Sequence, residues 1–119
     1  MDYVVIDVDS MGLVCDKIHA FFDGASYKDL FWTHNFDCGM EFEPFAGKRK
    51  FTNDVCVGVY TGDMGEREIV IDWDHKRSKI VINPGDKIAF LPNAICIKQD
   101  WESYASPHKE IVWRIERNK

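Results

Sequence analysis

Residues 34–38 read HNFDC and bring together histidine, aspartate and cysteine, three residue types that bind transition metals. Successive side chains of an extended segment point to opposite sides, so this stretch would supply at most two ligands to one ion. A third ligand would have to come from Asp72, Asp74 or His75. We therefore predict no metal site here, and we interpret residues 34–38 as a turn in which Asn35 and Asp37 bond the local backbone.

A nucleophile and a carboxylate are the other candidates for chemistry. Cys15 and His19 have the i, i+4 spacing that places both on one helix face, but no partner pair that would complete a metal site is visible. A thiolate activated by His19 would also need an oxyanion or base arrangement, and the sequence shows none. Asp63 lies in a glycine-rich turn, where an aspartate more simply bonds its own backbone. The sequence therefore predicts no catalytic residue, no metal and no cofactor.

Large aromatic residues are the stronger indication of a binding site. Trp73 and Trp113 alternate with polar residues in predicted strands, and we expect them in the core. Trp101 and Tyr104 lie in the predicted loop 100–108, where large aromatics tend to anchor a ligand or a partner; packing of the loop onto the sheet edge is the competing interpretation. The predicted ligand-binding residues are Trp32, His34, Asp63, Trp101 and Tyr104.

The elements that must position these residues are mostly strands. Residues 57–92 alternate apolar and polar positions between short polar turns, which is typical of antiparallel sheets. Pro84 and Gly85 suit the two central positions of a type II turn. Further strands are predicted at 3–8, at 40–44, from 95 onward and at 111–115, with a polar loop at 47–53. For residues 16–32 the apolar spacing favours either short helices, capped by Asp16 and Ser26, or a strand pair.

We therefore predict an all-β fold, a single domain over residues 1–119. It is either a small antiparallel β-sandwich or jelly roll, or a β-clip-like barrel, with one or two short helices. A chain of 119 residues with 45% hydrophobic residues can bury a stable core without disulfide bonds or structural metal ions. The four cysteines are dispersed singly, and we expect them to be reduced.

Charge and hydropathy exclude several classes of partner. The net charge of −5 disfavours nucleic-acid binding, and we interpret the basic run 48–50 as a solvated loop. No apolar run approaches the roughly 20 residues that span a bilayer, and the N-terminal residues lack the features of a signal peptide. We expect a soluble, cytoplasmic protein that binds neither nucleic acid nor membrane.

Two resemblances suggest enzymes or metal proteins. Residues 58–63, GVYTGD, and 85–91, GDKIAFL, resemble the core strands of the dUTPase-like β-clip family, which implies a nucleotide hydrolase with Asp63 in place of the water-activating aspartate. The Asp-Leu, Pro-Arg-Ser and glycine-rich C-terminal motifs of that family are missing. Residues 84–93, PGDKIAFLPN, resemble the second cupin motif, and His34, Phe36 and Glu41 keep the spacing of the first. This implies a degenerate cupin that retains one metal through His34 and Glu41, because one histidine of each motif is missing.

A third resemblance is to a family of bacterial and phage proteins of unknown function. Its signature holds HF-x-x-G, GVVETDW, a strand ending in NW, and GEP followed by a proline. The matching positions are His34, Phe36, Gly39, Gly58, Val59, Asp63, Asp72, Trp73, Gly85 and Pro92. The resemblance spans about half of the chain and implies a β-rich, phage-type accessory protein.

The function predicted from these observations is that of a non-catalytic binding or accessory protein, phage-encoded if the third resemblance holds. Its partner would be a small ligand or a protein, held by an aromatic-lined pocket or loop. Pairing of an exposed edge strand at 110–116 would offer a route to a homo-oligomer. A dUTPase-like nucleotide hydrolase and a degenerate metal-binding cupin are the alternatives.

Overall fold

The computed structural model describes residues 2–37, 42–44, 48–74, 78–101 and 109–118. In chain order the elements within these ranges are β1 (Val4–Val5), α1 (Met11–Phe22), the 3-10 turn η1 (Tyr27–Asp29), β2 (Leu30–Asp37), β3 (Phe42–Pro44), β4 (Arg49–Lys50), β5 (Cys56–Thr61), β6 (Arg67–Asp72), β7 (Lys79–Ile82), β8 (Lys87–Leu91), β9 (Ala94–Trp101) and β10 (Lys109–Arg117).

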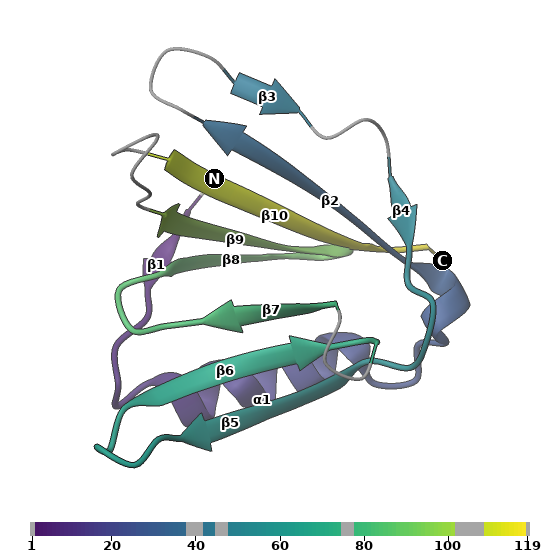
Figure 1. Ribbon diagram of the computed structural model, residues 1–119. Coiled ribbons are helices and arrows are strands. Elements are labelled where there is room, and N and C mark those ends of the chain that lie inside the picture. The colour runs from purple at the N-terminus through teal and green to yellow at the C-terminus, as the bar shows by residue number, and fades with distance from the viewer. Residues whose placement is uncertain (1, 38–41, 45–47, 75–77, 102–108, 119) are drawn as a thin grey trace.

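The strands form two antiparallel sheets (Figure 1). Sheet A has seven strands in the order β1-β8-β9-β10-β2-β3, and β4 also pairs with β2. Sheet B has three strands in the order β5-β6-β7. Within the described ranges neither sheet closes on itself. The prediction of a small antiparallel all-β sandwich is therefore confirmed, whereas the barrel that was its alternative is not formed by these residues.

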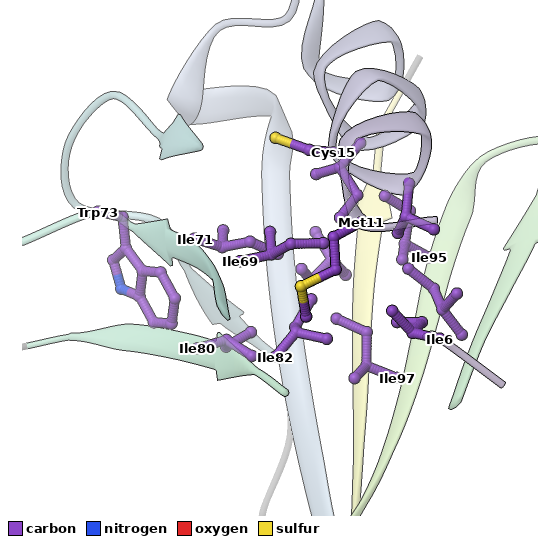
Figure 2. Packing of buried hydrophobic residues seen from close by; sticks show 14 of the residues in the cluster. Ile6, Met11, Cys15, Ile69, Ile71, Trp73, Ile80, Ile82, Ile95 and Ile97 are labelled. Carbon is purple, nitrogen blue, oxygen red and sulfur yellow. The ribbon is translucent and has the colours of Figure 1, made fainter. Parts of the chain in front are cut away.

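One hydrophobic core joins the two sheets and the helix (Figure 2). Strand β6 shows how the sequence builds it, because Ile69 and Ile71 are buried while Val70 and Asp72 between and after them are only half-buried. Strand β7 follows the same alternation, whereas β8 and β9 bury consecutive residues, Ile88 and Ala89 in the first and 94–97 in the second. Helix α1 buries residues at the three- and four-residue spacing of one helix face. Its buried residues are Met11, Val14, Cys15 and Ile18.

For residues 16–32 the sequence predicts either helices or a strand pair, and the structure contains both kinds of element. The prediction that Asp16 caps a helix is wrong, since α1 already begins at Met11 and Asp16 lies exposed inside it. Ser26 does cap a short helix, because its hydroxyl accepts a hydrogen bond from the Lys28 N–H. Leu30 does not extend that helix and instead begins β2, which is hydrogen-bonded to β10 in an antiparallel ladder.

Two further predictions fail because of pairing between distant segments. The turn expected at 34–38 is wrong over its described part, since residues 34–37 belong to β2 and pair with 110–113 of β10. The exposed edge expected at 110–116 is also wrong, because β10 is paired with β2 on one side and with β9 on the other. Oligomerisation through that strand would break an existing ladder.

The turns fit the predictions better. Gly85 has φ of 96°, and the Asp86 N–H donates to the Asn83 carbonyl over 3.1 Å, which closes the predicted turn. The loop predicted at 47–53 contains the short strand β4, and the first strand is limited to Val4–Val5.

Within the described ranges no helix is long and apolar enough to span a bilayer.

Candidate functional site

The inner face of sheet A places aromatic side chains in adjacent rows. Trp113 of β10 pairs with His34 of β2, and in the next row on that face Ile115 pairs with Trp32. The rings of Trp32 and His34 stack with centroids 5.6 Å apart and an interplanar angle of 15°. Trp113 packs against both, at 5.0 Å from His34 and 5.7 Å from Trp32. These distances are typical of favourable aromatic pairs.

Sheet B completes this aromatic cluster, which we define as Trp32, His34, Phe51, Trp73 and Trp113. Trp73, directly after β6, is 4% exposed and lies 5.5 Å from Trp32, so it joins the two sheets as the predicted core residue. Phe51 is also buried and meets Trp73 edge to face at 5.0 Å. Trp32, His34 and Trp113 are half-buried. The cluster thus runs from the core to a partly open inner face of sheet A.

His34 has an unusual setting for a titratable group. Burial lowers its pKa below the ordinary value of 6.5, and the neighbouring Arg49 guanidinium lowers this pKa further. Arg49 pairs with Trp32 across β4 and β2, and its guanidinium carbon lies 6.0 Å from the Trp32 ring centroid. The imidazole is therefore mainly neutral at pH 7. Since the unfolded chain takes up this proton at a higher pH than the folded chain, acidification below about pH 6.5 destabilises the fold.

A polar network borders the cluster and is centred on the Gln99 side chain of β9. Trp113 Nε1 donates to Gln99 Oε1 over 3.0 Å, and Gln99 Nε2 donates to the Val81 carbonyl over 2.6 Å and to Asp86 Oδ2 over 2.8 Å. Asp86 Oδ2 also accepts from the Asn83 N–H over 2.8 Å. The amide of Gln99 therefore uses both donors and its acceptor, which fixes its orientation.

A hollow of about 190 Å³, which we call the Asp86 cavity, opens beside this network. Its lining residues are Val81, Asn83, Asp86, Gln99, Asp100 and Ile111. Ile111, which pairs with Gln99, supplies apolar wall, while Asp86 supplies a carboxylate, which accepts hydrogen bonds and attracts cations. Asp100 follows Gln99 on β9, so its side chain points to the other face of sheet A. This arrangement can bind a small cationic or hydrogen-bond-donating group next to an apolar surface.

The structure brings together only some of the residues predicted to bind a ligand. Trp32 and His34 stack on each other in the aromatic cluster. Trp101 is the last residue of β9 and pairs with Lys109, but the position of its side chain lies outside the described part of the molecule, as does Tyr104 altogether. Asp63 is exposed in the β5–β6 turn, at the opposite end of β6 from Trp73. It therefore does not belong to this site.

Sequence reasoning missed Gln99 and Asp86, which organise the site. One signal was available, because Gln99 follows Ile95 and Ile97 in the inward register of β9 and is thus a polar residue at a core-facing position. Asp86 directly follows Pro84 and Gly85, so its place in the sequence indicates only a turn residue. Its second role depends on contact with a residue of the next hairpin, and the turn itself gives no sign of it.

The other candidates for chemistry are not assembled into a reactive site. Within the described ranges, no group of three or more histidine, cysteine, aspartate or glutamate residues is placed to hold a metal ion. Cys15 is 6% exposed, whereas His19 faces solvent, so the two do not form a pair. Burial, and then the nearby Asp16 carboxylate, raise the pKa of the Cys15 thiol, which makes it a poorer nucleophile.

Comparison of the chain with protein-family models, with curated proteins and with solved structures finds no match.

Proposed function

We propose that this chain is a non-catalytic binding protein whose ligand enters the Asp86 cavity. The observation that carries the proposal is the placement of the Asp86 carboxylate beside Ile111 in one hollow, with the Gln99 amide between them. Binding sites typically combine an apolar lining with a few polar groups in fixed positions. Gln99, held by three hydrogen bonds, supports the fixed position of Asp86.

The chemistry of the cavity favours an organic cation with a short apolar body. The Asp86 carboxylate would attract an ammonium group, whereas a phosphate or carboxylate ligand would be repelled. A volume of about 190 Å³ is smaller than that of most drug-sized pockets, about 300–1,000 Å³, so it suits a small molecule or the terminal group of a larger one. This charge balance also speaks against a nucleotide as the ligand.

The proposal is tested by a matched set of small probes and by NMR. The probes are n-butylammonium, n-butanol and butyrate, which share an alkyl chain and differ in charge. We expect n-butylammonium to shift the amide signals of 81–83, Gly85 and Asp86 and the indole N–H signal of Trp113, because that N–H bonds Gln99 beside the cavity. Butanol should bind more weakly and butyrate should not bind.

Two variants that change the charge equally provide the control. Asp86→Asn removes the carboxylate at the cavity, while Asp63→Asn removes one from the distant β5–β6 turn. We expect Asp86→Asn to weaken n-butylammonium binding by roughly fivefold or more, consistent with a lost hydrogen bond to a charged group, and Asp63→Asn to leave it within twofold. Equal binding of butyrate, or equal effects of the two variants, would refute the proposal.

A further inference from the structure

The two edges of sheet B differ in how their backbone groups are satisfied. Along β7 the carbonyl of Val81 accepts a hydrogen bond from the Gln99 side chain of sheet A, so this edge is bonded to the rest of the protein at that residue. Along β5, the described part of the chain pairs only on the β6 side. An edge strand with open donors and acceptors is a template for pairing with another chain.

The ladder shows which residues of β5 direct their backbone outward. The Gly62 N–H donates to the Glu66 carbonyl over 2.7 Å, so Gly62 is bonded toward β6. In an antiparallel ladder the direction alternates, which assigns Val57, Val59 and Thr61 to the open edge. The same rule can be checked on the other side of β6. The Trp73 N–H donates to the Ser78 carbonyl, so Ser78 is bonded toward β6, and alternation along β7 then directs the backbone of Val81 away from β6. The Val81 carbonyl indeed accepts its bond from Gln99, outside sheet B.

Strand β5 lacks the features that usually protect an edge. Its sequence, CVGVYT, contains no charged residue and no proline, and the six residues pair with β6 without a bulge. Tyr60 is 59% exposed, and its ring lies 3.5 Å from where a side chain on Gly58 would begin. Tyr60 therefore covers Gly58 on the outer face of the sheet and leaves the edge itself open.

Helix α1 packs on one face of sheet B, against β5 and β6 (Figure 1). A hollow of about 370 Å³ lies between the C-terminal half of α1 and Val55, which precedes β5. It is lined by His19, Ala20 and Phe22 of the helix and by Asp23 and Gly24 directly after it. An added strand along β5 would thus have room for a side chain at the Val55 end, beside the helix.

The charges around this edge select the partner. Exposed aspartates lie on the helix at Asp16, directly after it at Asp23, and beyond the two ends of β5 at Asp54 and Asp63. Antiparallel pairing of β5 with a second copy would bring Asp54 of one chain close to Asp63 of the other, and like charges in that position repel. A strand with basic residues at its ends would meet these carboxylates favourably.

We infer that the open edge of β5 is a docking site for an extended peptide segment of a partner protein, a short uncharged stretch flanked by lysine or arginine. The segment adds to sheet B as a fourth strand beside β5. Its backbone bonds Val57, Val59 and Thr61, and its basic ends face the carboxylates around this edge. This site is on the opposite edge of sheet B from the Asp86 cavity and does not depend on it.

The probe is a synthetic peptide, Lys-Lys-Thr-Val-Thr-Val-Thr-Lys-Lys, compared with the same peptide in which glutamate replaces every lysine. Hydrogen exchange followed by NMR measures amide protection in the protein. We expect the lysine peptide to slow exchange at Val57, Val59 and Thr61 and to bind more weakly as salt is raised, while the glutamate peptide does not bind. Binding of both peptides alike, binding of neither, or protection confined to residues 56, 58 and 60 would overturn the inference.

The matched variants are Thr61→Pro, which removes one outward N–H at an exposed position, and Thr61→Val, which keeps it. We expect Thr61→Pro to weaken peptide binding by roughly two- to tenfold and Thr61→Val to leave it within twofold. If Thr61→Pro does not fold, lysine peptides N-methylated at alternate residues test the same bonds, and only one of the two alternating sets should abolish binding. A dimer in light scattering that Thr61→Pro dissociates would place a second copy on this edge and overturn the assignment of a basic partner.

Discussion

Replacing Gln99 with leucine tests whether the polar network holds the two sheets in place. The substitution keeps most of the side-chain volume but removes the bonds to the Val81 carbonyl, to Asp86 Oδ2 and from Trp113 Nε1. The Val81 bond connects sheet A to the edge of β7, and the Asp86 bond connects β9 to the turn between β7 and β8. We expect the loss to lower the free energy of unfolding without changing the fold.

The size of the effect follows from the three bonds. Two are between neutral groups and contribute about 0.5–1.5 kcal/mol each, while the bond to the Asp86 carboxylate contributes about 1.5–3 kcal/mol. The site is only partly buried, so water replaces some of what is lost and leucine gains some apolar burial. A net loss of about 2–4 kcal/mol is therefore expected, a large share of the roughly 5–15 kcal/mol that stabilises an ordinary domain.

Urea unfolding followed by far-UV circular dichroism measures the change, with a midpoint shift of about 1–2 M for this loss. A double-mutant cycle with Asp86→Ala isolates the bond between Gln99 and Asp86, and a coupling energy of about 1 kcal/mol or more is expected. A fall in the free energy of unfolding by less than about 0.5 kcal/mol for Gln99→Leu, as for an ordinary surface substitution, would refute the reasoning.

Three other predictions concern titration, backbone conformation and thiol reactivity. Because the pKa of His34 is lowered by burial and Arg49, His34→Phe should reduce the loss of stability between pH 7 and pH 5; an equal loss in the variant and the parent protein would contradict this. Gly85→Ala should lower the free energy of unfolding in urea by about 1–2 kcal/mol, since φ there is 96° and alanine disfavours positive φ. An unchanged midpoint would contradict this. Peptide mapping after brief alkylation should find Cys56 modified and Cys96, 2% exposed, protected; the reverse order would contradict the burial.

Much of the fold could be predicted from the sequence because its signals are local. The alternation of Ile69 and Ile71 with half-buried residues marks a strand with one buried face, and Pro84-Gly85 marks a turn by the backbone angles these residues favour. Pairing partners carry no such signal. Residues 110–116 therefore looked like an edge, although two long ladders make them the centre of sheet A.

The candidate site was less predictable for the same physical reason. Trp32 and His34 were chosen for their residue type, and the stacking that joins them follows from their two-residue separation on one strand. Gln99 contacts residues 13, 14 and 18 positions away, so its role exists only after three strands and a turn have assembled. Local patterns identify aromatic residues readily, but they do not identify the amide that orients them.

The central position of β10 has a consequence for how the chain folds. β10 follows every other described strand in the sequence, yet it lies between β9 and β2 in sheet A. β9 directly precedes β10, whereas the residues of β2 that pair with β10 lie up to 87 positions earlier, as in the pair Leu30–Arg117. Until that long loop closes, β2 has no partner on this side and its aromatic face has no Trp113 to pack against. We therefore expect slow folding that is limited by docking of the β9–β10 hairpin onto β2, and a transient intermediate whose unpaired β2 edge is the main route to aggregation.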